Sequence, residues 1–315
     1  ASDKSGNVVH LFERDCSLQR NNQKVIEECP AVNLSDALKK EMYKSSIIIT
    51  KNIKYEGVGT IEFLVEDDKY YFMEMNTRLQ VEHGITEKIT NIDLVELQIN
   101  IAKGLNLNFS QEDIFSKGHS IEARLYAEDP ENNYAPCPGK VIKAEFLENI
   151  NTRVDKSLES GDEVSAYYDP MIAKIICYAE DRNKCINALE NAILKTKIYG
   201  IKTNKLYLSN ILSHKTFLVG AYGTKLLTKE ISYLIKNKVV EKDYKLRTAS
   251  ILLRHRINSN NIKLLNMNET NSPWLKLFGF RQNITFQEKL LFSEYDKSFY
   301  VNIIYYADRI ELTDD

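Results

Sequence analysis

The chain has 315 residues, of which 43% are hydrophobic and 27% charged, so it has an ordinary globular composition with room for about two or three domains. Its formal net charge of −2 gives no electrostatic reason to expect nucleic acid or an anionic membrane as a partner. Its five cysteines lack CxxC spacing and no apolar run approaches the roughly 20 residues that span a bilayer, so we expect free thiols, no zinc site and no membrane segment.

The first 110 residues are predicted to alternate strands and helices. The chain begins without Met or a signal-peptide pattern and soon enters a strand-like stretch at residues 8–12, which suggests a fragment. A helix should follow, with Ser35 or Asn33 as its N-cap, and another over residues 93–103, with Asp93 as N-cap and Gly104 just after its end.

Between these helices the pattern predicts a hairpin. A three-residue turn at Asp67-Asp68-Lys69 would make Glu62 oppose Glu74, so that both carboxylates share one face. A two-residue loop would instead pair Glu62 with Met73 and send Glu74 to the other face. The face opposite the carboxylates is expected to pack on a core and carries Ile61, Phe63, Val65, Tyr71, Met73 and Met75.

After the hairpin, polar residues recur at every second position: Glu74, Asn76, Arg78, Gln80 and Glu82. In an extended strand these five side chains project from the same side. Hard oxygen donors joined by an amide suit Mg²⁺, which commonly shares its shell with substrate phosphates. A charged strand that faces solvent would explain Glu62 or Glu74 alone, whereas five polar residues in register favour metal and anion binding.

Two further segments contain isolated cations. Residues 13–24 hold Arg14, Arg20 and Lys24 among several amides and are interpreted either as a salt-bridged turn or as an oxyanion site. In the second segment Glu122 and Arg124 share one strand face, which suggests an internal ion pair. The chain has no P-loop, because no GK[ST] follows its close glycine pair.

Residues 118–227 are predicted to form a second α+β unit, with strands at 120–126, 139–146 and 173–179 and a helix at about 181–196. The pattern changes near residue 228. A helical stretch at 242–256 precedes short strand-like runs at 262–267, 278–287, 289–295, 299–306 and 309–312, which suggest a small β-barrel or sandwich.

The motifs ERDCSLQR, GVGTIEFL, MEMNTRLQVEHGITE, HSIEARLYAEDP, PCPGK, YYDPMIAKI and GIKTN occur in this order. Together they closely resemble the biotin carboxylase portion of biotin-dependent carboxylases, over about residues 8–227. The resemblance implies an α+β fold, with a partial ATP-grasp domain (its C-terminal subdomain) at 1–112 and a biotin carboxylase C-terminal domain at 113–228. Residues 229–315 resemble a partial β-subunit-interaction domain, with a helix and a β-barrel, of methylcrotonoyl-CoA or propionyl-CoA carboxylases, through the matches SPW at 272–274 and GFRQN at 279–283.

Such enzymes use MgATP to activate bicarbonate as carboxyphosphate and then carboxylate biotin. The resemblance implies metal ligation (Mg²⁺ or Mn²⁺) by Glu62 and Glu74 with help from Asn76, and a base at Glu82. It further implies bicarbonate binding by Lys24, Arg78, Gln80 and the Val81 backbone, and stabilisation of carboxyphosphate or the biotin enolate by Arg124. Gln19 and Leu64 would lie near the nucleoside, and Asn22 stands where the family usually has a nucleotide-contacting His.

The chain also departs from the family pattern. Gly84 replaces the usual Pro, which would loosen that turn, and residues 1–315 contain no match to the N-terminal domain and glycine-rich ATP lid that the family pattern leads us to expect. No Met-Lys biotinylation site is present. The resemblance therefore implies biotin on a separate carrier domain, a carboxyltransferase β-subunit partner, an oligomer, and a cytoplasmic or mitochondrial-matrix location. We expect this chain alone to be inactive; the alternatives are a non-catalytic assembly fragment or another ATP-grasp ligase.

Overall fold

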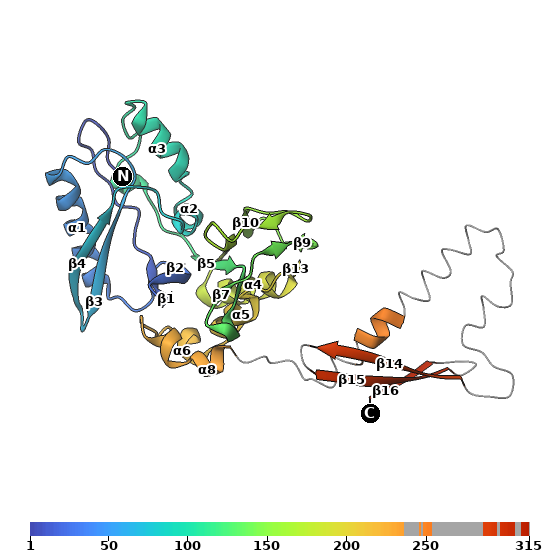
Figure 1. Ribbon diagram of the computed structural model, residues 1–315. Helices are drawn as coiled ribbons and strands as arrows, with labels where there is room; N and C mark the ends of the chain where they lie inside the picture. The colour runs from blue at the N-terminus through green and yellow to red at the C-terminus, as the bar shows by residue number, and fades with distance from the viewer. Residues whose placement is uncertain (236–245, 247, 254–285, 295–296, 306–309, 315) are drawn as a thin grey trace. The chain divides into compact units, whose positions relative to one another are not determined.

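The computed structural model describes residues 1–235, 246, 248–253, 286–294, 297–305 and 310–314 (Figure 1). The chain divides into two units, Ala1–Lys236 and Asn237–Asp315, and each is described by itself. No helix in the described residues combines the length and apolar character needed to cross a membrane.

The N-terminal unit contains a first hairpin, made of β1 (Asp15–Arg20) and β2 (Gln23–Cys29). Asn21 and Asn22 form its two-residue turn with φ of 50° and 61°, a left-handed conformation that Asn tolerates well. Residues 13–24 are therefore mostly strand. The strand predicted at residues 8–12 is wrong: within the described chain, this stretch pairs only through an isolated bridge between Val8 and Ser2.

Two helices begin at the predicted caps. The Ser35 hydroxyl accepts a hydrogen bond from the Leu38 N–H (3.2 Å) at the start of α1 (Asp36–Asn52). The Asp93 carboxylate accepts one from the Glu96 N–H (2.8 Å) at the start of α3 (Leu94–Ala102). Both predictions are confirmed, because a short oxygen-bearing side chain satisfies an otherwise free N–H at each helix start.

The second hairpin consists of β3 (Thr60–Glu66) and β4 (Lys69–Asn76). Its loop has two residues, Asp67 and Asp68, with φ of 48° and 55°, so the predicted three-residue turn is wrong. Glu62 nevertheless opposes Glu74, because the register shifts by one residue between Glu62 and Phe63 and leaves Met73 as a bulge.

The bulge also changes which side chains share a face. Tyr71 pairs with Leu64 and therefore lies on the Glu62 face, whereas Phe72 pairs with Phe63 on the opposite face. The expected apolar face is thus wrong for Tyr71 and Met73. Tyr71, Phe72 and Met73 are all exposed, so the loop half of this hairpin does not pack into a core.

A further correction concerns the segment after β4. The strand ends at Asn76, and the expected extended run continues instead as an irregular connection to α2 (His83–Thr90), with Glu82 as the N-cap residue. Gly84 in the first turn of α2 has a packing role, because a Cβ there would lie 2.4 Å from Ile176 Cδ1. Glycine allows α2 to lie close to the neighbouring sheet rather than loosening the turn.

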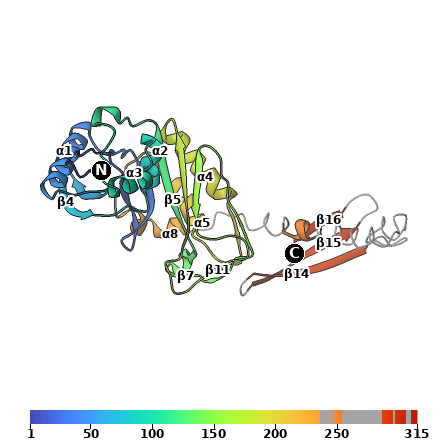
Figure 2. The same cartoon turned by 90° about the horizontal axis from the view of Figure 1, so that it is seen from above.

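That sheet is antiparallel and has the order β1-β2-β5-β12-β10, with β5 at His119–Tyr126, β10 at Thr152–Lys156 and β12 at Met171–Ala179. One face packs on α4 (Arg182–Lys195) and α5 (Lys205–Leu212), and α2 covers the other (Figure 2). The alternation predicted for β5 is confirmed: Ile121, Ala123 and Leu125 enter the core with α4 and α5. Glu122 and Arg124 therefore face α2.

The strand predicted at residues 139–146 is split in two. Its first half pairs with β11 (Glu163–Val164) and its second half with β13 (Lys197–Tyr199). Between the halves, the Val141 N–H donates to the Asp162 carbonyl and the Ile142 N–H to the Tyr199 carbonyl. The remaining elements of this unit are short: β6 (Glu128–Asp129), β7 (Ala135–Pro136), β8 (Gly139–Lys140), β9 (Lys143–Glu145), β11 (Glu163–Val164), β13 (Lys197–Tyr199), α6 (Lys215–Leu218), α7 (Leu226–Lys229), α8 (Ile231–Leu234) and the 3₁₀ turns Gln111–Asp113 and Pro130–Asn132.

The described part of the C-terminal unit is one antiparallel sheet, made of β14 (Phe286–Glu294), β15 (Lys297–Tyr305) and β16 (Ile310–Asp314), together with helical residues at 248–253. Leu253 packs there with Ile303 and Tyr305. β14 runs through residue 288, where a break was predicted, and no barrel is present in the described residues. The strand predicted at 262–267 and the motifs at 272–274 and 279–283 lie outside the described residues.

Candidate active site

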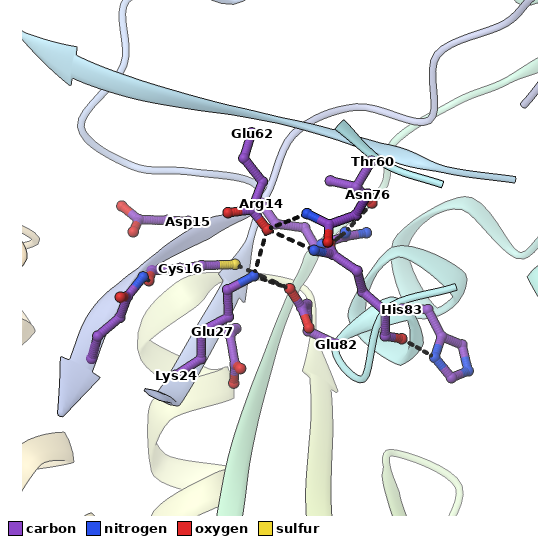
Figure 3. Close-up of polar contacts among 12 residues, drawn as sticks. Arg14, Asp15, Cys16, Lys24, Glu27, Thr60, Glu62, Asn76, Glu82 and His83 are labelled. Carbon is purple, nitrogen blue, oxygen red and sulfur yellow. Dashed lines mark hydrogen bonds and ion pairs between the residues drawn. The ribbon is translucent and has the colours of Figure 1, made fainter. Parts of the chain in front are cut away.

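Three charged residues from separate elements meet beside the second hairpin (Figure 3). Lys24 on β2 donates from Nζ to Glu82 Oε1 (2.6 Å) and to Glu62 Oε1 (2.9 Å). Glu82 is 2% exposed at the start of α2, and Glu62 is partly buried on β3. One ammonium group therefore joins two of the predicted site carboxylates.

The predicted amides complete this cluster. Gln80 Nε2 donates to Glu62 Oε1 at 2.6 Å, and Asn76 Nδ2 donates to the same oxygen at 3.2 Å and to Glu74 Oε1 at 3.1 Å. Arg78, which is exposed, donates from Nη2 to Asn76 Oδ1 at 3.2 Å. The structure thus brings the metal, amide and arginine candidates together without the continuous strand that was expected to align them.

Sequence reasoning treated Arg14 only as part of a cationic segment and missed its place in the site. Its guanidinium donates to Gln80 Oε1 (2.6 Å), Thr60 Oγ1 (2.9 Å) and Thr86 Oγ1 (3.0 Å). It therefore links β3, the segment before α2, and α2 itself. The sequence signal that could have found it is its position: Arg14 directly precedes β1, and β1 forms a hairpin with the strand that carries Lys24.

Arg124 approaches the same cluster from β5. Its Nη2 lies 2.9 Å from Glu82 Oε2 and 2.6 Å from Glu27 Oε1. The predicted ion pair between Glu122 and Arg124 is wrong, because the partners of Arg124 come from β2 and from the start of α2. Glu27 was missed because its role depends on the pairing of β2 with β5.

The electrostatics of Glu82 favour its ionised form. Burial raises the pKa of Glu82, but the nearby cations Arg14 and Lys24 outweigh that effect and lower it to about 2. Burial lowers the pKa of Lys24, but Cys16, Glu82 and the hydrogen bonds to Glu82 and Glu62 raise it to about 12. Glu82 is therefore a carboxylate and Lys24 an ammonium at neutral pH.

Two further carboxyl groups lie deeper in the sheet. Glu27 and Glu122 are cross-strand partners, both 0% exposed. Glu27 is paired with Arg124, whereas within the described part of the chain the carboxyl oxygens of Glu122 have no hydrogen-bond partner. Burial raises the pKa of Glu27 to about 7, despite the opposing effect of Arg124. Burial and the charge of Glu27 raise the pKa of Glu122 well above its ordinary value.

The remaining predicted residues lie at the margins of the cluster. Gln19 donates to the Cys16 carbonyl (2.8 Å), and the Val81 carbonyl accepts a hydrogen bond from Lys174 Nζ (2.6 Å). Asn22 at the hairpin turn and Leu64 on β3 are exposed, and no hydrogen bond or ion pair within the described residues links them to the cluster. Asn22 therefore has a turn-forming role in this structure.

The donor set around Glu62 fits a hard divalent cation. In the described residues no three His, Cys, Asp or Glu side chains converge as a metal cluster. The opposed carboxylates of Glu62 and Glu74 nevertheless supply two oxygen ligands of the kind that Mg²⁺ uses when phosphates complete its shell. The Asn76 amide nitrogen faces both carboxylates, so in this arrangement Asn76 links the two acids.

Comparison with known proteins accounts for most of the chain. Residues 1–110 match the family model "Carbamoyl-phosphate synthase L chain, ATP binding domain", and residues 122–229 match "Biotin carboxylase C-terminal domain". The mitochondrial methylcrotonoyl-CoA carboxylase subunit alpha of Dictyostelium discoideum is 41% identical over 305 residues, covering 96% of this chain and 43% of that protein. The biotin carboxylase of Halalkalibacterium halodurans is 43% identical over 232 residues, covering 73% and 51%.

Solved structures of biotin carboxylases also match this chain. The biotin carboxylase domain dimer of Hydrogenobacter thermophilus 2-oxoglutarate carboxylase, in complex with MgADP, ADP and bicarbonate, matches with a TM-score of 0.73 and 38% identity, covering 76% of this chain and 52% of that one. Campylobacter jejuni biotin carboxylase matches with a TM-score of 0.70 and 43% identity, covering 72% and 51%. The chain spans about half the length of the relatives that it matches.

Proposed function

Because the chain belongs to the biotin carboxylase family, we propose that it supplies the metal- and bicarbonate-binding half of a site for ATP-dependent carboxylation of biotin, through carboxyphosphate. The observation that carries this proposal is the position of Glu82, which is buried, ionised and shared between Lys24 and Arg124. Such a carboxylate is ionised and lies beside the cations that would attract an anionic substrate, so it is placed to accept a proton from that substrate.

The cations determine how basic Glu82 can become. With a pKa of about 2 it is a weak base as long as Lys24 remains hydrogen-bonded to it. A bicarbonate ion that binds beside Lys24 would compete for the ammonium group, weaken the hold on Glu82 and raise its basicity. Substrate binding would thus activate the base that acts on it.

The other polar groups have matching roles. Lys24, Arg78, the Gln80 amide and the Val81 N–H would hold bicarbonate, since a charged fork, an ammonium and neutral donors together satisfy an oxyanion. Arg124 would stabilise carboxyphosphate or the biotin enolate. Gln19, Asn22 and Leu64 would lie on the nucleoside side of the site.

Glu62 and Glu74, linked by Asn76, would hold Mg²⁺ or Mn²⁺. A bound ion supplies positive charge to the transferring phosphoryl oxygens. The contribution of the chain is to hold the two carboxylates opposite each other while Lys24 and Gln80 fix the Glu62 carboxylate.

Of the two types that the sequence predicts, methylcrotonoyl-CoA and propionyl-CoA carboxylase, the relatives support the first. Methylcrotonoyl-CoA carboxylase alpha subunits align over 96–97% of this chain, including its C-terminal unit. That unit would be part of a helix-and-barrel domain that binds the carboxyltransferase β subunit. Biotin would arrive on a separate carrier domain of an oligomeric assembly, in the cytoplasm or the mitochondrial matrix.

ATP turnover tests this proposal. The chain would be fused at its N-terminus to the ATP-lid segment of a relative, and ATP hydrolysis measured with and without bicarbonate and free biotin. We expect hydrolysis to require bicarbonate and to increase with biotin. Hydrolysis that is indifferent to both, but stimulated by another acyl acceptor, would show a different ATP-grasp ligase.

A further inference from the structure

Two consecutive backbone carbonyls beside the site are held by side chains. The Gln80 carbonyl lies 2.7 Å from His83 Nδ1, and the His83 ring lies on the side away from Lys24 and Glu62 (Figure 3). The next carbonyl, that of Val81, accepts a hydrogen bond from Lys174 Nζ at 2.6 Å. The irregular segment between β4 and α2 is therefore anchored through its peptide groups.

Lys174 is itself held firmly in place. It is 8% exposed on β12, where it is the cross-strand neighbour of Arg124. Its Nζ lies 3.2 Å from Asp155 Oδ2 on β10. Asp155 also accepts hydrogen bonds from Arg153 Nε (2.7 Å) and Nη2 (2.9 Å), and Arg153 Nη1 pairs with Glu87 Oε2 on α2 at 2.6 Å. A chain of charges thus connects β10, β12 and α2 to the Val81 carbonyl.

Because peptide groups are planar, holding the Gln80 and Val81 carbonyls also orients the N–H groups that follow them. In a trans peptide the C=O and N–H groups point in opposite directions, so fixing a carbonyl also fixes the N–H of the following residue. His83 therefore sets the direction of the Val81 N–H, and Lys174 sets that of the Glu82 N–H. The Glu82 N–H is hydrogen-bonded to the Glu82 carboxylate and contributes to the low pKa of that group.

We propose that Lys174 is a positioning residue whose ammonium, anchored by Asp155, orients the peptide between Val81 and Glu82, so that the Glu82 N–H supports the Glu82 carboxylate where it faces bicarbonate. This inference rests on the proposed bicarbonate site and extends it to a residue that touches no reactant. Removing the ammonium frees this peptide to rotate, which moves the Glu82 N–H away from the Glu82 carboxylate and disorders the base beside the anion site.

The test uses the whole 315-residue chain, labelled with ¹⁵N, and bicarbonate as the probe at constant pH. The amide resonances of Val81 and Glu82 are followed during bicarbonate titration in the wild type, Lys174→Met and Lys174→Arg. Lys197→Met, which removes a lysine–carboxylate pair at the surface, is the control. We expect Lys174→Met to weaken bicarbonate binding about tenfold, Lys174→Arg to restore most of it, and the control to match the wild type.

Mn²⁺ binding and thermal unfolding separate positioning from a structural role. We expect Lys174→Met to retain the Mn²⁺ affinity of the wild type. Equal losses of Mn²⁺ and bicarbonate affinity, together with a lower unfolding temperature, would overturn the inference. Asp155→Asn is an independent check that leaves the Lys174–Val81 contact in place: we expect about threefold weaker bicarbonate binding, and unchanged binding would contradict the proposed anchor.

The two proposals fail in different ways. If the wild-type amides do not respond to bicarbonate, the proposed anion site is wrong. If the wild type binds bicarbonate and Lys174→Met binds it equally well, the site is correct and the role of Lys174 is wrong.

Discussion

Glu62 and Glu74 are direct cross-strand partners although the loop between their strands has only two residues. The two-residue loop alone would place Met73 opposite Glu62 and turn Glu74 to the other face. The bulge at Met73 takes up the extra residue and returns both carboxylates to one face. The proposed metal site therefore depends on an irregularity in β4.

The bulge predicts opposite effects for two deletions in this hairpin. Deleting Met73 removes the unpaired residue and leaves Glu62 opposite Glu74, so Mn²⁺ binding should persist. Deleting Phe63 from β3 moves Glu62 opposite Phe72 and should weaken Mn²⁺ binding at least about tenfold, because one carboxylate ligand is lost. Mn²⁺ titration followed by electron paramagnetic resonance measures both variants, with circular dichroism to confirm folding. Equal affinities in the two variants would refute this assignment of ligands.

The ion pair between Lys24 and Glu82 predicts a titration effect. Lys24→Gln removes a major cause of the low pKa of Glu82, so that pKa should rise above about 2. Carboxyl ¹³C NMR of glutamate-labelled protein measures it. Arg78→Gln is the control, because Arg78 contacts Asn76 and the Leu79 carbonyl and should affect Glu82 far less. A Glu82 pKa that is unchanged in Lys24→Gln would contradict the electrostatic interpretation of the site.

Glu27 predicts a pH dependence of stability. Its pKa is raised from 4.5 to about 7 on folding, so the folded chain binds more protons than the unfolded chain between these values. The free energy of unfolding contributed by Glu27 should therefore fall as pH rises from about 4.5 to 7. Glu27→Gln should remove roughly 1–3 kcal/mol of the change between pH 5 and pH 8, as measured by urea denaturation. Identical pH profiles for variant and wild type would show that Glu27 titrates normally.

The hydrogen bonds of Glu28 predict that its removal lowers the stability of the fold. Its buried carboxylate accepts hydrogen bonds from His119 (2.6 Å), Tyr222 and, through two contacts, Arg182 (2.7 and 3.0 Å), and so joins β2 to β5, α4 and the chain beyond α6. Glu28→Ala leaves the partly buried Arg182 with backbone carbonyl partners but no carboxylate, and should lower the free energy of unfolding by about 3–5 kcal/mol. Urea denaturation measures this, with the exposed Glu180→Ala, expected to leave the midpoint unchanged, as control. A midpoint shift as small as that of the control would contradict this prediction.

Local sequence patterns predicted the features that depend on local chemistry. Ser35 and Asp93 cap the expected helices, and the alternation in β5 correctly places Ile121 in the core and Arg124 on the opposite face. The Glu62–Glu74 pairing was predicted correctly from an incorrect turn length. The error arose because a bulge has no distinct signature in a strand that is polar on one face and partly exposed on the other.

The predictions that failed concern contacts between residues far apart in the chain. Arg14 contacts Gln80, and Glu27 meets Arg124, only because β1, β2, β5 and the start of α2 come together in three dimensions. Lys174 lies 93 residues from the carbonyl that it holds. No local periodicity encodes such contacts, so the sequence indicated the chemistry of the site better than the supports that position it.

The most direct test is the transfer of labelled carbon from bicarbonate to free biotin by the lid-fused chain, compared between the wild type and Glu82→Gln. If Glu82 is the base, the variant should bind MgATP as the wild type does but form carboxybiotin at least about 10² times more slowly. Carboxybiotin formation by Glu82→Gln at the wild-type rate would contradict the central role that we assign to Glu82.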